Sequence, residues 1–116
     1  MTRPEELLAD QIYKQLNCKE PQTKEIIKQF LLDIQLFDKK HSDYGPHNID
    51  KFGIMGVLVR SSDKMERLIN LYEKSTSSPR NTDESVIDSW ADLSVYGAIA
   101  RTIEKDNWNV SKKPSQ

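Results

Sequence analysis

Two segments decide the fold of this chain: RSSDKMERLINL at residues 60–71 and DESVIDSWADL at residues 83–93. In the first segment, apolar side chains recur with the three-to-four-residue spacing of an amphipathic helix. In the second, carboxylates recur every four residues, which places them on one side of a helix. Residues 75–81, STSSPRN, join the two segments and have the composition of a loop. The sequence therefore predicts two helices with a loop between them.

The helix predicted at residues 57–74 divides its side chains into an apolar face and a polar face. A helix turns by about 100° per residue, so side chains three, four or seven positions apart lie on the same side. The polar face consists of Arg60, Asp63, Arg67 and Asn70, with Lys64 beside them. The apolar face consists of Val57, Leu58, Ser61, Met65, Leu68, Ile69 and Tyr72. A polar stripe of this kind is typical of a solvated helix face that carries ion pairs.

The following helix, from residue 84 to about residue 106, carries a row of acids beside apolar side chains. Its acidic row, Glu84, Asp88 and Asp92, shares one side of the helix with Val95 and Ile99. A separate apolar face consists of Val86, Trp90, Leu93, Gly97 and Ala100. A helix with two apolar faces is expected at the centre of its bundle, so the carboxylates are expected to face a cleft.

Two interpretations of the acidic row stay open at the level of sequence. Carboxylates one turn apart repel each other, and buried charges need partners. Either the acids form salt bridges with the basic residues of the 57–74 helix, or they hold Mg²⁺ while the basic residues bind substrate phosphates. The basic set is Arg60, Lys64 and Arg67; the catalytic and metal-binding set is Glu84, Asp88 and Asp92, with Asp63 as a further metal ligand.

The remaining segments predict an all-α bundle of about four helices. Further helices are expected at residues 4–16 and 23–40, the second with an apolar stripe of Ile26, Ile27, Phe30, Leu31, Ile34 and Phe37. Residues 1–108 are expected to form a single helical domain, followed by a flexible tail at 109–116. Residues 41–49 are expected to be a loop, and its candidates for contacting a base or sugar are Asp43, Tyr44, His47 and Asn48.

Composition limits the classes of function. The chain has 116 residues, of which 36% are hydrophobic and 30% charged, and this polar balance suits a bundle that self-association completes. A net charge of −1 offers no basic footprint for binding duplex nucleic acid. A lone cysteine, Cys18, favours a reducing cytosol, and no apolar run reaches the ~20 residues of a membrane span. A cytoplasmic homo-oligomer without a membrane segment is expected.

Several motifs together resemble the nucleotide modification associated domain 1 family of phages and bacteria. The resemblance covers residues 41–108 and rests on motifs in a fixed order. They are Asp43-Tyr44-Gly45, Gly56 to Arg60, Asp63-Lys64, Arg67-Leu68, Asn70-Leu71, Asp83-Glu84-Ser85, Asp88, Asp92-Leu93, and Tyr96 with Ile99-Ala100. The resemblance implies a helical domain encoded among genes of nucleotide metabolism and DNA modification, in the cytosol of a bacterial or phage-infected cell.

The same region is similar in style to all-α nucleoside triphosphate pyrophosphohydrolases, which hold Mg²⁺ with paired ExxE and ExxD motifs. This chain departs from that pattern, because Ser89 stands where ExxD ending at Asp92 requires glutamate. Three functions are therefore expected as alternatives. They are a nucleotide-binding protein with Mg²⁺-dependent hydrolysis of a nucleoside phosphate, a non-catalytic binder that sequesters a nucleotide signal of host defence, and a structural or partner-binding bundle.

Overall fold

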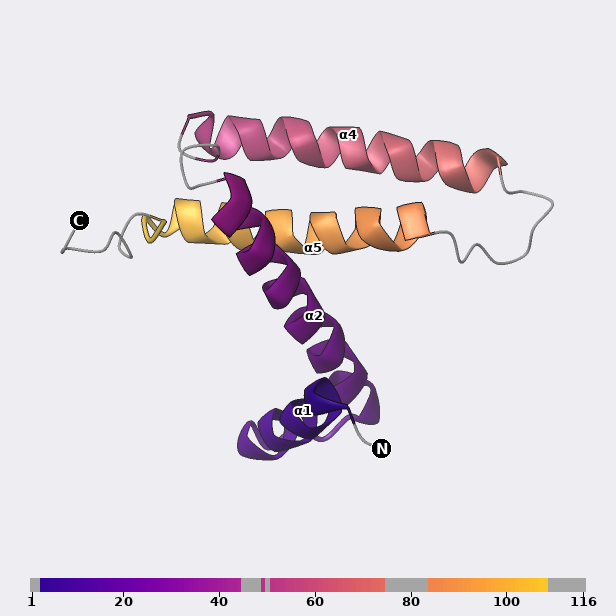
Figure 1. Cartoon of the computed structure of the whole chain (residues 1–116), viewed down its shortest axis with the longest axis vertical. Helices are drawn as coiled ribbons and strands as arrows, with labels where there is room; N and C mark the ends of the chain where they lie inside the picture. Colours follow the sequence, from indigo (N-terminus) through magenta and orange to yellow (C-terminus); the bar gives the residue numbers. More distant parts are fainter. Residues whose placement is uncertain (1–2, 45–48, 50, 75–83, 109–116) are drawn as a thin grey trace. The chain divides into compact units, whose positions relative to one another are not determined.

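The chain is all-α. The structure, a computed structural model, describes residues 3–44, 49, 51–74 and 84–108. These residues form four helices: α1 (Pro4–Gln15), α2 (Pro21–Tyr44), α4 (Gly53–Lys74) and α5 (Glu84–Glu104), as Figure 1 shows. The prediction of an all-α fold with about four helices is confirmed. Residues 1–43 and residues 44–116 make two compact units, and the single domain expected over residues 1–108 stays a prediction.

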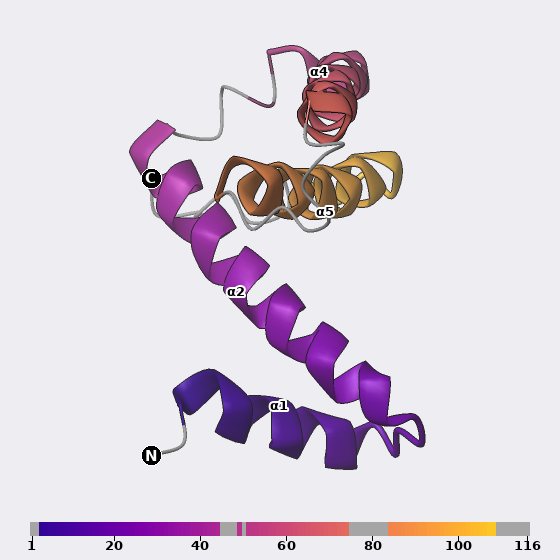
Figure 2. The same ribbon diagram turned by 90° about the vertical axis from the view of Figure 1, so that its right-hand side faces the viewer.

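The first unit is a helical hairpin with a defined turn. Asn17 has a φ of 55°, and its N–H donates to the carbonyl of Lys14 while the N–H of Cys18 donates to the carbonyl of Tyr13. This pair of bonds is the Schellman motif, which closes a helix by satisfying its last carbonyls. Asparagine is one of the few residues other than glycine that adopts such a conformation readily. The turn ends α1 and sends the chain back into α2 (Figure 2).

Few side chains are buried in this hairpin. Ala9 of α1 and Ile27 of α2 are buried, and beside them Asp10 and Lys24 form a salt bridge of 2.9 Å between the helices. The hydrogen bond from Lys24 holds the pKa of the Asp10 carboxyl below its ordinary value. The apolar stripe expected to face a core along α2 is largely exposed. The exposed members of that stripe are Ile26, Phe30 and Ile34.

Helix α2 is longer than the sequence pattern predicts. The loop expected at residues 41–49 begins later, because residues 41–44 complete the last turn of α2. Nothing in that turn breaks a helix before the Gly45-Pro46 pair, and proline disfavours helical geometry only in the residue that precedes it. The rings of Phe37 and His41, one turn apart, stack with centroids 5.1 Å apart and support the extension. Asp43 and Tyr44 therefore belong to a helix and not to a loop.

In the second unit, α4 and α5 lie side by side and run in opposite directions, as both ribbon views show (Figures 1 and 2). Each helix turns a heptad-spaced stripe toward the other, which is the spacing that packs two helices along their length. In both stripes the side chains are buried or half-buried. The stripe on α4 is Val57, Ser61, Lys64, Leu68 and Leu71; that on α5 is Val86, Ser89, Leu93, Tyr96, Ala100 and Ile103.

The contact face of α5 lies between the two faces that the sequence predicts. Trp90 is 49% exposed and Gly97 is exposed, whereas Ser89 and Ile99 are buried. The expected apolar face around Trp90 is therefore one edge of the contact, and the acidic row is the other edge. The sequence predicted the wrong contact face because apolar residues lie on both edges of the true one. The small side chains of Ser89 and Ala100, between those edges, admit the close approach of α4.

Helix α4 opens with a close contact between a glycine and a phenylalanine. Gly53 begins the helix with a φ of +59°, a conformation that glycine adopts at little cost. One turn later, the N–H of Gly56 donates to the carbonyl of Phe52, and a Cβ on Gly56 would overlap the Cβ of Phe52. Gly56 is therefore required so that Phe52 can fold back over the first turn of α4.

At the other end of the unit, α5 closes as α1 does. Asp106 has a φ of 60°, its N–H donates to the carbonyl of Ile103, and the N–H of Asn107 donates to the carbonyl of Thr102. This second Schellman motif ends the helix within two residues of the predicted boundary. Within the described ranges, no helix combines the length and the apolar character needed to cross a bilayer.

Replacing Gly56 with alanine is expected to lower the free energy of unfolding by about 1–3 kcal/mol, because the added methyl group must displace Phe52. Gly97→Ala is the matched control, since a Cβ at this exposed helical glycine meets no atom within 4 Å. It is expected to raise the free energy of unfolding by about 0.5–1 kcal/mol. Urea unfolding followed by circular dichroism measures both. Equal stabilisation by the two substitutions would contradict the close contact.

Candidate functional site

One edge of the α4–α5 contact carries opposite charges. The Nζ of Lys64 lies 2.8 Å from Oδ2 of Asp92, and the side chain of Asp92 is only 14% exposed. Lys64 lies on the polar edge of α4 and Asp92 on the polar edge of α5. The two residues meet because these edges lie on the same side of the antiparallel pair. A half-buried carboxylate loses much of its hydration and needs such a partner. For this pair, the structure matches the first interpretation of the sequence, an internal salt bridge.

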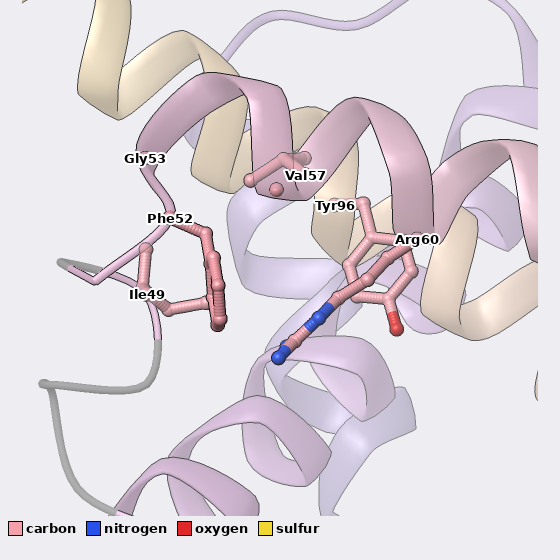
Figure 3. Close-up of a pocket in the computed structure, with 7 residues that line it drawn as sticks. Ile49, Phe52, Gly53, Val57, Arg60 and Tyr96 are labelled. Carbon is pink, nitrogen blue, oxygen red and sulfur yellow. The ribbon is translucent and has the colours of Figure 1, made fainter.

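One turn from this ion pair, Arg60 lies at the mouth of a small hollow. The hollow is lined by Ile49, Phe52, Gly53, Gly56, Val57, Arg60 and Tyr96, all from the second unit. Figure 3 shows the side chain of Arg60 extending alongside the ring of Tyr96, with its guanidinium group toward the space near Phe52. The surface of the hollow is almost entirely apolar, and Arg60 lines it mainly with the aliphatic part of its side chain.

The antiparallel register explains why Arg60 meets Tyr96. Arg60 precedes Lys64 by four residues on α4, and Tyr96 follows Asp92 by four residues on α5. Each step of four residues is about one helical turn, and the two steps run in the same direction in space because the helices are antiparallel. The Lys64–Asp92 pair thus fixes the neighbours of Arg60.

The other predicted site residues are distributed differently. Arg67 and Asp63 of α4 and Asp88 of α5 are exposed, so the expectation that the whole acidic row faces into a cleft is wrong for Asp88. The reason is that the contact with α4 is centred on the Ser89 side of α5, which leaves Asp88 beyond its edge. The side chains of Asp43, Tyr44 and Glu84, and the residues His47 and Asn48, lie outside the described part of the structure.

Magnesium binding would need oxygen ligands from several residues. Across the side chains that the structure describes, no three His, Cys, Asp or Glu residues lie close enough together to hold a metal ion. Asp92 places an oxygen on the ammonium group of Lys64, and Asp88 is exposed one turn away. Mg²⁺ demands near-ideal octahedral oxygen coordination, which these two described carboxylates do not make on their own. The prediction of Mg²⁺ as a cofactor therefore rests on Glu84 and on a rearrangement of Asp92.

Of the residues that line the hollow, only Arg60 was predicted as a site residue, and the sequence pattern did not single out the two aromatic ones, Phe52 and Tyr96. Phe52 is distant from the acidic row in the chain, and Tyr96 was a member of the motif series without an assigned role. A signal for Tyr96 was present, because it lies one turn beyond Asp92 on the same helix. No comparable signal marked Phe52, whose position depends on the absence of a side chain at Gly56.

Comparison with known proteins adds no assignment. No family model matches the chain, and neither a curated protein nor a solved structure matches it significantly. The resemblance to the nucleotide modification associated domain 1 family stays a prediction, and the case for a function rests on the geometry of α4 and α5.

The salt bridge between Lys64 and Asp92 is expected to couple the two residues energetically. Lys64→Met and Asp92→Asn should each destabilise the protein, and the double variant should lose less than the sum of the two. A coupling energy of about 1 kcal/mol is expected for a half-buried contact pair. Urea unfolding of the four proteins in this cycle measures it.

The control for this cycle is the pair Lys24 and Asp10 in the first unit, where both side chains are more exposed than those of Lys64 and Asp92. Exposed ion pairs contribute little because water and salt screen them. A coupling energy that is no larger for Lys64 and Asp92 than for this control would show that the α4–α5 contact does not depend on the ion pair.

Proposed function

We propose that the protein binds a phosphorylated nucleotide at the Arg60 end of the α4–α5 pair. The observation that carries the proposal is that Arg60, Phe52 and Tyr96 line one hollow, and that the guanidinium of Arg60 extends from its rim. A planar guanidinium group suits the bidentate recognition of phosphate oxygens. Aromatic rings next to it offer flat apolar surface for a base or a sugar. The two chemistries required by a nucleotide are therefore adjacent.

The size of the hollow indicates how a nucleotide would bind. The cavity has a volume of about 10 Å³, which is roughly the room that one water molecule requires. The hollow would hold at most one small apolar group, and the phosphate would lie outside it, beside the guanidinium of Arg60, because an apolar lining disfavours a charged oxygen. Binding of this kind is expected to be moderate in affinity and strongly dependent on Arg60.

Two neighbouring features favour an anion at this position. The hollow includes Gly53 and Gly56 of the first turn of α4, and a helix N-terminus carries a partial positive charge. The ammonium group of Lys51 lies 5.5 Å from the centre of the Phe52 ring. Both features add positive potential next to the guanidinium of Arg60.

Binding is tested with a panel of mono-, di-, tri- and cyclic nucleotides by isothermal titration calorimetry. Arg60→Ala is expected to weaken the affinity about tenfold or more, since a hydrogen bond between charged groups contributes about 1.5–3 kcal/mol. Arg101→Ala is the matched control, because Arg101 is an exposed arginine in the last turn of α5 and is absent from the lining of the hollow. No binding by the wild type to any nucleotide, or equal losses in both variants, would contradict the proposal.

Mg²⁺-dependent hydrolysis is the enzymatic form of this proposal. It requires Asp92 to exchange Lys64 for a metal ion that Glu84 and Asp88 would share, with Asp63 as the further predicted ligand. Incubation of the bound nucleotide with Mg²⁺, followed by chromatography of the products, separates the alternatives. Turnover that is lost in Asp88→Ala supports hydrolysis. Intact nucleotide supports a non-catalytic binder, such as one that sequesters a nucleotide signal of host defence.

The salt bridge between Lys64 and Asp92 favours a second candidate, a structural or partner-binding bundle. In that case the charged edge serves the packing of α4 against α5, and Arg60 has no ligand. Arg60→Ala distinguishes the two functions, because it should leave any nucleotide affinity unchanged if the role is structural. A loss of nucleotide affinity at an unchanged melting temperature would exclude this candidate.

A further inference from the structure

Helix α4 has a second heptad-spaced stripe, which is turned roughly 110° around the helix axis from the first. The positions Met55, Leu58, Ser62, Met65, Ile69 and Tyr72 follow one another at alternating intervals of three and four residues. This spacing is that of the a and d positions of a coiled coil, which pack against a neighbouring helix. We call these six residues the outer seam.

The outer seam is exposed along its whole length. Its five apolar side chains are between 44% and 64% exposed, and Ser62 is exposed between them. The stripe that contacts α5, by contrast, is buried or half-buried at every position from Val57 to Leu71. A helix needs only one apolar stripe to pack in a hairpin, so the second stripe indicates a further helix as neighbour.

The α4–α5 pair encloses little apolar surface by itself. Its buried apolar side chains among the described residues are Val57, Leu68, Val86 and Ile99. Two helices make a single layer, and a stable hydrophobic core needs a second layer. Two copies of the pair, joined along their outer seams, would form two layers of antiparallel helices, the arrangement of a four-helix bundle.

The extent of the outer seam is that of a small protein interface. An aromatic side chain covers about 150–250 Å² when fully buried, and the aliphatic side chains that make up most of the outer seam cover less. Half-exposed, the five apolar members therefore offer at most roughly 500 Å², below the ~800 Å² per partner of a standard interface and in the range of weak complexes. Trp90 extends it at one end, because its Nε1 donates to the hydroxyl of Tyr72 at 3.2 Å.

We infer that the outer seam is the contact surface of a homodimer, with a second copy of this chain as its occupant. The same stripe then meets itself across a twofold axis, which is the usual symmetry of a dimer. Ser62, near the middle of the stripe, is the single polar member and would restrict the register of the two helices. On the helical wheel, Arg60 and Lys64 lie more than a quarter-turn away from the outer seam, so the dimer leaves the candidate nucleotide site open.

Disulfide cross-linking tests the position of the interface. The variant Ser62→Cys, made in a Cys18→Ser background, is expected to form a covalent dimer under mild oxidation. If the two α4 helices pair in parallel, residue 62 faces residue 62 of the other copy. If they pair antiparallel, residue 62 lies near the twofold axis, so the two thiols are again close. Asp63→Cys is the matched control, because Asp63 is the adjacent exposed residue and points about 100° away from the outer seam. Equal cross-linking of the two variants, or none in either, would overturn the inference.

Sedimentation equilibrium tests the contribution of the apolar side chains. In runs at protein concentrations from about 1 to 500 μM, the wild type is expected to show a concentration-dependent dimer, because small interfaces form weak complexes. Ile69→Glu should shift it to the monomer, whereas Asn70→Glu, at the adjacent exposed position outside the outer seam, should leave the dimer intact. Circular dichroism confirms that both variants stay helical. A wild type that is monomeric throughout this range would overturn the inference.

Discussion

The contact between α4 and α5, with the Lys64–Asp92 ion pair at its edge, is the constraint on which the second unit depends. A lysine within a heptad-spaced stripe reduces the apolar area of the contact. In the observed register, Nζ of Lys64 lies 2.8 Å from Oδ2 of Asp92, and the two half-buried charges compensate each other. The position of Arg60 beside Tyr96 follows from the same register, since each residue lies one turn from a member of the pair.

Helix α4 is the element shared by every feature of this unit. Its inner stripe packs on α5, its polar edge supplies Lys64 and Arg60, and its outer seam exposes a second set of apolar side chains. These three surfaces lie at different angles around one helix, and so they can serve packing, ligand binding and self-association without competing. The high charged content of the chain is consistent with this division, because a thin layer of helices has little interior to fill.

In the sequence, the acidic row was open to two interpretations, a salt-bridge network with the basic residues of the 57–74 helix and a Mg²⁺ site. In the structure, Asp92 is engaged with Lys64 and Asp88 is exposed, while Arg60, Phe52 and Tyr96 line one hollow at the start of α4. Arginine beside aromatic rings supports recognition of a phosphorylated, ring-containing ligand without requiring chemistry on it. This is why binding is proposed ahead of hydrolysis.

The sequence by itself determined the all-α class, the helix at 57–74 to within four residues at its start, and a charged edge that includes Lys64 and Asp92. Helical periodicity and breakers such as Gly45-Pro46 are local properties, and local spacing therefore predicts them. Tertiary structure alone decided three outcomes. It decided which charged residues pair, it left Trp90 and Asp88 on opposite sides of the contact face of α5, and it brought Phe52 to the hollow. The first two outcomes depend on the line along which the two helices pack, which on α5 includes the small side chains of Ser89 and Ala100. The third depends on the absence of a side chain at Gly56. A wheel of one helix contains no information about its neighbour, so only the packed pair could show where the site lies.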